Sequence, residues 1–434
     1  MLIEFSVTNF QSFKERQTFS TLASKDSLLN ATNLFEVNGK NYSKINVFYG
    51  ANASGKTAFF RAFQFVRAFV SMSNQMLDKT LIPLTPFCFD DASLKRPSVF
   101  ELVFFKDKIK YSYSFSCDRK VVYTERLDIY ENGKPKLVFD RSNINQYKIN
   151  SYHELETIKD KNTNNKLFLC TAATWNFDLV KPVVDFILQD LRFRFNVSYE
   201  DSGEVEMIPF IEHLQEEGLF DEYKKFCLKL LSIGDFSIAD FDAKIENADI
   251  ESFPEEIRGF FNAVKQLPLP PEATTDVLKN LRLITIHSVV GEDGKIINKR
   301  LNFESESLGT KALFKMAPVL FDVLRQGKIL VVDELDRSLH PLLAKYIVSL
   351  FVSETNTNNA QLIFNTHDTN LLDLDILRRD EIWFVERDSK TGVSVIYPLT
   401  DFSPRNNENI EKGYLLGRYG AIPFIRNGGN LWEE

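Results

Sequence analysis

Cysteine, glycine and proline are scarce in this sequence of 434 residues. Four cysteines, 18 glycines and 15 prolines accompany 44% hydrophobic and 26% charged residues, which excludes a disordered, collagen-like or low-complexity chain. The cysteines show no CxxC pair and no histidine at zinc-ligand spacing, which argues against a zinc motif. We therefore expect reduced, mostly buried thiols, as in a cytosolic protein, at Cys88, Cys117, Cys170 and Cys227.

Long apolar runs and an excess of positive charge are also missing. No stretch approaches the roughly 20 uninterrupted apolar residues that a membrane helix requires, and the opening MLIEFSVTNF carries Glu4 and lacks the basic segment of a secretion signal. We expect a cytoplasmic protein without a membrane partner. The net charge is −8, so DNA could bind only at a local basic patch, and charge alone does not support DNA binding.

Periodicity divides the chain into two α/β blocks around a helical middle. The apolar pattern of the first block predicts a strand, a glycine loop and a helix, followed by an antiparallel meander. The pattern of the last block predicts alternating helices and strands that end in a hairpin. Residues 175–285 between them are helical in pattern and locally acidic. The expected strands lie at 2–8, 45–49, within 99–130, at 328–332 and at 361–365, and the expected helices at 57–70, 310–324 and 341–352.

The segment GANASGKT, between an expected strand and an expected helix, matches the phosphate-binding pattern GxxxxGK[ST]. Its two glycines let the backbone curl so that N–H groups point at phosphates, and the helix start adds its positive end. The lysine would reach the β- and γ-phosphates, and the threonine hydroxyl would bind magnesium. A glycine-rich turn that matches by chance is the alternative. The candidate nucleotide-binding residues are Gly50, Asn52, Ser54, Gly55, Lys56 and Thr57.

Two acids follow the apolar run of KILVVDELD, residues 328–336. Acids at the end of a buried strand are costly unless they are paired or hydrogen-bonded. We therefore expect Asp333 and Glu334 to have such partners or a functional role. A Walker B arrangement supplies one: Asp333 would hold magnesium, and Glu334 would act as the general base on water. The alternative is a strand that simply ends in a polar loop.

Two weaker motifs complete the set. In NTHD, His367 follows an apolar strand and could donate a hydrogen bond to a γ-phosphate, although a histidine at a strand end is often structural. In ESLGT, Ser307 and Gly309 stand at the start of an expected helix and could form an anion site, although a serine N-cap is the ordinary reading.

The order of these motifs resembles the ATP-binding-cassette (ABC) ATPases. The sequence is most similar to their SMC, RecF and OLD branch, and within it to standalone bacterial AAA-type ATPases grouped with restriction and abortive-infection systems. The segments that carry the resemblance are TNFQSF, ESLGT, DELDRSLHP, FNTHDTNLL, RRDEIWFVERD and GYLLGRYGAIPF. It implies an α/β P-loop NTPase of ABC type with an antiparallel β subdomain, whose head comprises 1–174 and 286–434 and whose inserted helical arm comprises 175–285.

The resemblance also implies how such a head works with ATP and Mg²⁺. Ser307 and Gly309 of one chain would cap the γ-phosphate held by Lys56 of a second chain, Glu334 would support hydrolysis, and residues 336–339 would form the loop that links the two sites. The sequence departs from the family pattern at Gln11, where relatives often carry a basic residue. No glutamine switch can be placed between residues 60 and 110.

These expectations combine into one leading function and one alternative. The leading function is an ATPase switch that forms a homodimer or higher assembly and regulates a separate effector, a nuclease or toxin from a neighbouring gene, in antiphage defence. The alternative is a DNA-binding repair or genome-maintenance ATPase like RecF or SMC, which the net charge disfavours. The stretch after His367 is too short for the fused nuclease domain of OLD enzymes.

Overall fold

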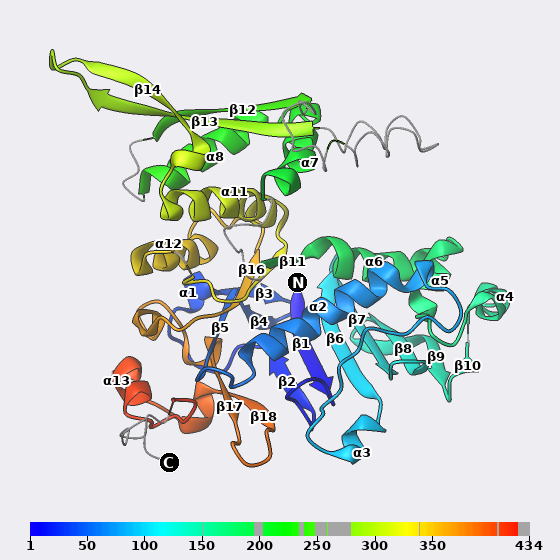
Figure 1. Ribbon diagram of the computed structural model, residues 1–434. Helices are drawn as coiled ribbons and strands as arrows, with labels where there is room; N and C mark the ends of the chain where they lie inside the picture. The colour runs from blue at the N-terminus through cyan, green and yellow to red at the C-terminus, as the bar shows by residue number, and fades with distance from the viewer. Residues whose placement is uncertain are drawn as a thin grey trace. The chain divides into compact units, whose positions relative to one another are not determined.

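The computed structural model describes residues 1–149, 151–194, 203–233, 238–247, 258, 279–337, 339–405 and 408–423. The chain folds into two compact units, and each is described here by itself (Figure 1). The first unit comprises Met1–Asn196, Val323–Arg337 and Ala344–Glu434. The second comprises Val197–Asp322 and Ser338–Leu343.

A six-stranded sheet forms the centre of the first unit, in the order β11-β15-β16-β5-β17-β18. Its first five strands are parallel and β18 is antiparallel to β17. Every residue of β5, β15 and β16 is buried, which explains why their sequences are largely apolar and do not alternate. The strands are β5 (Ile45–Tyr49), β11 (Leu191–Arg194), β15 (Ile329–Val332), β16 (Gln361–Asn365), β17 (Ile382–Arg387) and β18 (Ser394–Pro398).

A seven-stranded antiparallel sheet forms a second layer of the first unit, in the order β10-β9-β8-β7-β6-β1-β2. The expected meander is confirmed in β6, β7 and β8, whose alternating residues place one face against the core. The strands are β1 (Leu2–Thr8), β2 (Gln17–Ser20), β6 (Ser98–Lys106), β7 (Ile109–Cys117), β8 (Val122–Glu131), β9 (Lys134–Ser142) and β10 (Gln146–Lys148).

Helix α2 (Lys56–Met72) packs phenylalanine rings against both sheets. The Phe63 ring stacks on Phe5 of β1 at 3.7 Å between centroids, and the Phe59 ring lies 5.2 Å from Phe48 of β5. These rings are fully buried, and burial of large aromatic side chains is a main source of folding free energy. The helix that follows the glycine loop is therefore fixed by both layers.

Smaller elements complete the first unit. They are α1 (Asn30–Asn33), β3 (Leu34–Val37), β4 (Lys40–Ser43), η1 (Ser73–Gln75), α3 (Asp91–Leu94), α4 (Glu154–Ile158), η2 (Lys159–Lys161), α5 (Phe168–Thr174), η3 (Asp178–Val180), α6 (Lys181–Asp185), the π-helix η4 (Phe186–Asp190), η7 (Thr369–Leu371), η8 (Arg379–Glu381), η9 (Leu399–Phe402) and α13 (Ile410–Leu415). Helix α12 (Pro341–Val352) begins in the second unit and continues in the first.

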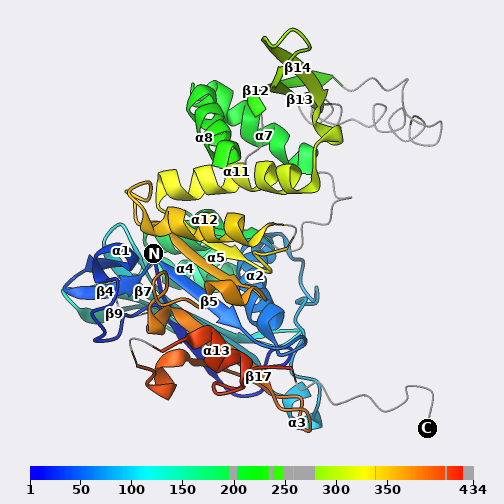
Figure 2. The same cartoon turned by 90° about the vertical axis from the view of Figure 1, so that its left-hand side faces the viewer.

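The second unit combines helices with a three-stranded antiparallel sheet in the order β12-β13-β14. Helices α7 and α8 and the sheet lie on the same side of α11 (Figure 2), and Tyr223 and Phe241 place their rings 5.5 and 5.1 Å from Phe321 and Phe314 of α11. The elements are α7 (Gly203–Glu216), α8 (Phe220–Ile233), β12 (Ile238–Asn247), β13 (Lys279–Val290), β14 (Ile296–Asn302), η6 (Phe303–Ser305) and α11 (Leu308–Gln326).

This division differs from the expected helical insert at 175–285. Residues 175–194 fold with the first unit because β11 pairs with β15 in the central sheet. The second unit runs on to Asp322, and its described part contains a sheet as well as helices. Residues 248–257 and 259–278 of the expected insert lie outside the described residues.

Two other expectations concern the whole chain. Cys117, Cys170 and Cys227 are buried free thiols, as expected, whereas Cys88 is exposed. Among the described residues, no helix combines the length and the apolar character needed to cross a lipid bilayer.

Candidate functional site

The glycine loop lies between β5 and α2, and its two glycines are required by close contacts. A Cβ on Gly50 would lie 2.4 Å from the Val385 carbonyl oxygen. Gly55 has a φ of +113°, and a Cβ there would lie 2.6 Å from the Ser394 Oγ and 2.8 Å from the Ser12 Oγ. Only glycine fits both positions, so the curled path of the loop depends on them.

Lys56 is a buried cation at the base of this loop. The residue is only 6% exposed, and its Nζ donates to the carbonyl oxygens of Gly50 at 2.6 Å and Ala51 at 3.1 Å. Burial lowers the pKa of Lys56 to about 8, against the opposing effect of the nearby Asp333 and Glu334 carboxylates. A buried ammonium group with mainly carbonyl partners is ready to accept an anionic ligand.

The acid at the end of β15 meets the start of α2. The Thr57 Oγ1 donates to the Asp333 Oδ1 at 3.2 Å, and the same carboxylate oxygen accepts a hydrogen bond from the Asn365 side-chain amide at the end of β16. The Asn365 Oδ1 in turn accepts from the Glu334 N–H at 2.9 Å. Asn365 therefore holds both acids in place, a role that its neighbourhood in the sequence does not reveal.

The donor set at this point suits magnesium. A threonine hydroxyl and a carboxylate are the hard oxygen ligands that Mg²⁺ prefers, and Mg²⁺ usually keeps further ligands from phosphate and water. Over the described ranges, no cluster of three or more histidine, cysteine or acidic side chains could form an all-protein metal cage. Thr57 and Asp333 fit a metal that arrives with a phosphate ligand.

Glu334 follows in a strained backbone conformation, with a φ of +59°. A bulky residue in the left-handed region costs on the order of 1–3 kcal/mol and persists only where its surroundings enforce it. Here the N–H bond to Asn365 enforces it, and the side chain, 35% exposed, lies 3.5 Å from the Arg337 guanidinium. The carboxylate is accessible to water next to Asp333.

His367 follows β16 on the same edge of the sheet. Its backbone N–H lies 3.3 Å from both carboxylate oxygens of Asp336. The pKa of His367 is lowered, first because neighbouring atoms displace part of its water and second because Lys56 is positively charged. Both causes favour a neutral imidazole, which can donate one hydrogen bond.

The N-terminal motif TNFQSF is linked to the glycine loop through Ser394 of β18. The Ser394 N–H donates to the Ser12 carbonyl at 2.8 Å, and the Ser394 Oγ donates to the Ser54 carbonyl at 2.7 Å. Asn9 fastens the motif by donating to the carbonyl of Ser93 at 2.9 Å. Ser394 has no motif in the sequence around it, because its role arises only when β18 folds beside the loop.

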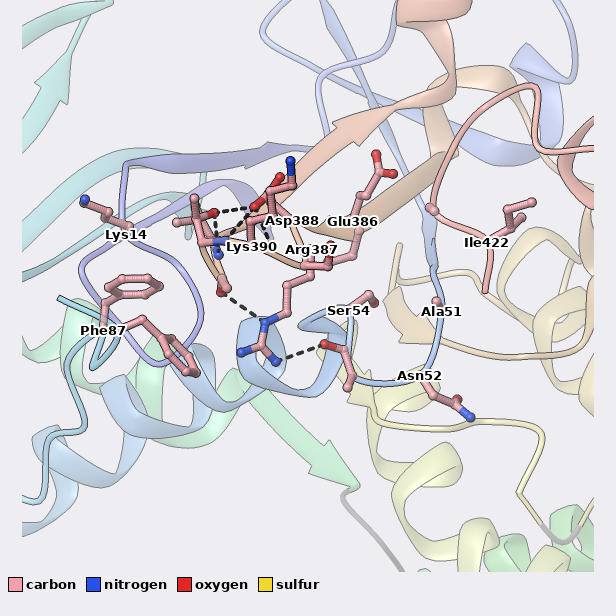
Figure 3. A pocket seen from close by; sticks show the side chains of 18 of the residues that line it. Lys14, Ala51, Asn52, Ser54, Phe87, Glu386, Arg387, Asp388, Lys390 and Ile422 are labelled. Carbon is pink, nitrogen blue, oxygen red and sulfur yellow. Dashed lines mark hydrogen bonds between the residues drawn. The ribbon is translucent and has the colours of Figure 1, made fainter. Parts of the chain in front are cut away.

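A cavity of about 700 Å³ opens beside the glycine loop (Figure 3). The Arg387 guanidinium lies 5.1 Å from the Phe89 ring and donates to the carbonyls of Gly392 at 3.1 Å and Ala53 at 3.4 Å. Lys14 pairs with Asp90 at 2.9 Å on another wall. The lining residues are Lys14, Ala51, Asn52, Ala53, Ser54, Phe87, Phe89, Asp90, the hairpin segment 385–393, Ala421 and Ile422.

Gln11 stands where relatives often carry a basic residue, and it contributes through its backbone. Gln11 adopts a φ of +48° and uses its backbone N–H to bond the Thr85 carbonyl at 2.9 Å. A basic side chain is nevertheless supplied by the same segment, since Lys14 lines the cavity.

A glutamine switch stays unassigned, and the strand that pairs with β15 does not come from residues 60–110. That strand is β11, whose Leu191 pairs with Ile329, and it lies far from the window of residues 60–110 in the sequence. The segment that follows Arg194 lies outside the described residues.

The ESLGT segment belongs to the second unit. The Ser307 Oγ accepts from the Thr310 N–H at 3.1 Å and lies 2.7 Å from the Thr310 hydroxyl, so it caps α11. Gly309 lies in the first turn of that helix. The structure thus brings together Lys56, Thr57, Asp333, Glu334 and His367 on one edge of the central sheet, and the anion role of Ser307 and Gly309 stays a prediction. Ser338, within the expected 336–339 loop, lies outside the described residues.

The parallel sheet, the glycine loop at its carboxyl edge and the acids after the neighbouring strand define an α/β P-loop NTPase of ABC type, and the antiparallel sheet is the expected β subdomain. Comparison of the sequence with protein families places the chain more narrowly. It belongs to the family described as "AAA domain, putative AbiEii toxin, Type IV TA system", which it matches over residues 45–168 and 180–373.

Similar solved structures include three heads of SMC proteins. An SMC head bound to the C-winged helix domain of ScpA has 11% identity, coverage of 92% of this chain and 97% of that chain, and a TM-score of 0.43. The SMC head domain from Thermotoga maritima has 13% identity, coverage of 92% of this chain and 98% of that chain, and a TM-score of 0.38. A Pyrococcus furiosus Smc head bound to a ScpA domain has 12% identity, coverage of 96% of this chain and 98% of that chain, and a TM-score of 0.37. A search of curated proteins gives no match.

Proposed function

We propose that this chain is an ATP-binding and hydrolysing switch that pairs with a second copy through its nucleotide sites and regulates a separate effector. The observation that carries the proposal is the convergence of Lys56, Thr57 and Asp333 at the carboxyl edge of the parallel sheet. A buried lysine, a hydroxyl and an acid in this arrangement suit a nucleoside triphosphate with its magnesium ion.

Each side chain would have a defined task in hydrolysis. The Lys56 Nζ would exchange its two carbonyl partners for phosphate oxygens. Thr57 and Asp333 would hold Mg²⁺, which supplies positive charge to the phosphate oxygens. The Glu334 carboxylate would orient water and accept its proton, and a neutral His367 would donate a hydrogen bond toward the γ-phosphate.

The cavity beside the loop would hold the base and ribose. It shares residues 51–54 with the phosphate loop, and its Phe89 ring and Arg387 guanidinium are flat groups on which a flat base can stack. Lys14 adds positive charge on the same side. This placement supports a full nucleotide over free phosphate as the ligand.

Pairing with a second copy would complete the site. Ser307 and Gly309 stand at the start of α11, a helix of 19 residues whose N-terminal end carries positive potential. In the proposed pair, this end caps the γ-phosphate bound by the other chain, so ATP joins the two chains and hydrolysis releases them.

The regulation of an effector is supported by the family description and by the chemistry of the described site. The family description refers to a toxin and a type IV toxin–antitoxin system, and the site described above accounts for phosphate chemistry only. We therefore propose a separate protein, a nuclease or toxin, as the regulated partner in antiphage defence.

The first test is magnesium-dependent ATP hydrolysis by the purified chain. Lys56→Ala should weaken ATP binding at least about a hundredfold, because it removes the charge-assisted bonds to phosphate. Arg61→Ala, which changes an exposed residue on the same helix, is the matched control and should bind as the parent does. ATP binding that survives Lys56→Ala, or the absence of hydrolysis in the parent, would contradict the proposal.

A further inference from the structure

The ESLGT segment is tied to the sheet of the second unit by a nearly buried carboxyl group. Glu306 directly precedes Ser307, and its side chain is 6% exposed. Its Oε1 accepts a hydrogen bond from the Thr285 hydroxyl and lies 2.6 Å from the His287 Nε2. Both partners belong to β13, and because they are two residues apart they lie on the same face of that strand.

This arrangement fixes the position of Glu306 strongly. A buried carboxyl group is costly unless its oxygens find partners, and the Thr285 hydroxyl and the His287 ring supply them for Glu306. Thr285 is itself 1% exposed, and its hydroxyl also lies 3.2 Å from the Leu301 carbonyl of β14. The acid is therefore held by the interior of the sheet rather than by a mobile surface group.

The residues around Glu306 are fixed by the same elements. Phe303, just before it, places its ring 4.8 Å from Phe314 of α11, and Phe241 of β12 lies 5.1 Å from the same ring. Ser307, just after it, caps α11 through the Thr310 N–H. The short path from Phe303 to Ser307 is thus anchored on both sides, and the sheet sets where α11 begins.

We propose that Glu306, held by Thr285 and His287, is a positioning residue that places Ser307 and Gly309 for the γ-phosphate of the second copy. This inference rests on the proposed function. Glu306 itself does not contact the nucleotide, because its carboxyl group is turned into the β13 face. Its loss therefore acts on pairing and hydrolysis and leaves ATP binding by the single chain unchanged.

Three variants of the full chain test this inference. Glu306→Leu removes the acceptor, and Glu306→Gln keeps an oxygen that can accept from both partners. Asp242→Asn is the matched control, because it breaks an ion pair to Arg300 in the same sheet without touching the ESLGT segment. ATP affinity, ATP-dependent pairing and hydrolysis at several protein concentrations are measured for each.

The expected result separates binding from pairing. Glu306→Leu should bind ATP with parental affinity, pair at least tenfold more weakly and hydrolyse correspondingly slowly at low protein concentration. Higher protein concentration, or Glu306→Gln, should restore most of the rate, and Asp242→Asn should behave as the parent. If Glu306→Leu does not fold, Thr285→Val, which removes one donor, should show the same separation with a smaller effect.

Two results would overturn the inference. Folded Glu306→Leu that pairs and hydrolyses like the parent would show that the anchor does not position the segment. A variant that loses ATP affinity together with thermal stability would show that Glu306 has a structural role alone. If the parent neither pairs nor hydrolyses with ATP, the proposed function fails, and this result is distinct because it appears before any variant is made.

Discussion

Lys56 illustrates at the scale of one residue how function and stability oppose each other. The buried ammonium group has a pKa lowered to about 8 from its ordinary value of 10.5, mainly because burial removes its water. The folded chain therefore favours the neutral form relative to the unfolded chain. At pH 7 the group is charged in both states, so it opposes folding, and this cost disappears as the pH rises from about 8 toward 10.5.

Lys56→Met should therefore stabilise the nucleotide-free, magnesium-free protein at pH 7. The free energy of unfolding should rise by about 1 to 3 kcal/mol, because the charge is removed while two hydrogen bonds to carbonyls are lost. Urea unfolding at pH 7 and at pH 10 measures the difference, which should shrink at the higher pH. A variant less stable than the parent at pH 7 would contradict this account of Lys56.

Single residues also show where sequence reasoning ends. The glycine loop and Asp333 were predicted because their types and spacing follow from phosphate and magnesium chemistry alone. Asn365 and Ser394 were not, since each acts through partners more than 30 residues away in the chain, such as Glu334 and Ser54. Ordinary polar residues gain such roles only through tertiary contacts.

At the scale of elements, the local sequence pattern predicted where strands begin and end, but it did not predict which strands pair. Strands β1, β5 and β16 begin and end where the alternation or the apolar run predicts. By contrast, β11 was read as part of a helical stretch. Only its parallel pairing with β15, more than 100 residues later, makes it part of the central sheet.

The β17–β18 hairpin provides a prediction at this scale, because Arg387 at the end of β17 lines the cavity beside the loop. Arg387→Ala should weaken ATP binding about tenfold, the value expected for losing a stacked guanidinium. Inorganic triphosphate, which has no base, should bind the variant and the parent equally. Competition against a fluorescent ATP analogue measures the affinities for ATP and for inorganic triphosphate. If Arg387→Ala weakens the binding of both ligands equally, the base does not bind in this cavity.

At the scale of the whole molecule, the motifs are distributed over both units. Lys56, Asp333 and Glu334 belong to the first unit, and Ser307 and Gly309 belong to the second. The expected insert thus ends later in the chain than its composition indicated, because α11 and the sheet β12–β14 share one hydrophobic core. The element proposed to act on a second copy is part of that unit.

The most direct test of the central claim is the mass of the Glu334→Gln variant in solution, measured by light scattering with and without ATP and Mg²⁺. We expect a monomer without ATP and a stable dimer or higher assembly with it, because the nucleotide binds and is not hydrolysed. Adding Ser307→Arg should return the ATP-bound protein to a monomer. A mass that does not change with ATP, together with hydrolysis at the parental rate, would contradict the account.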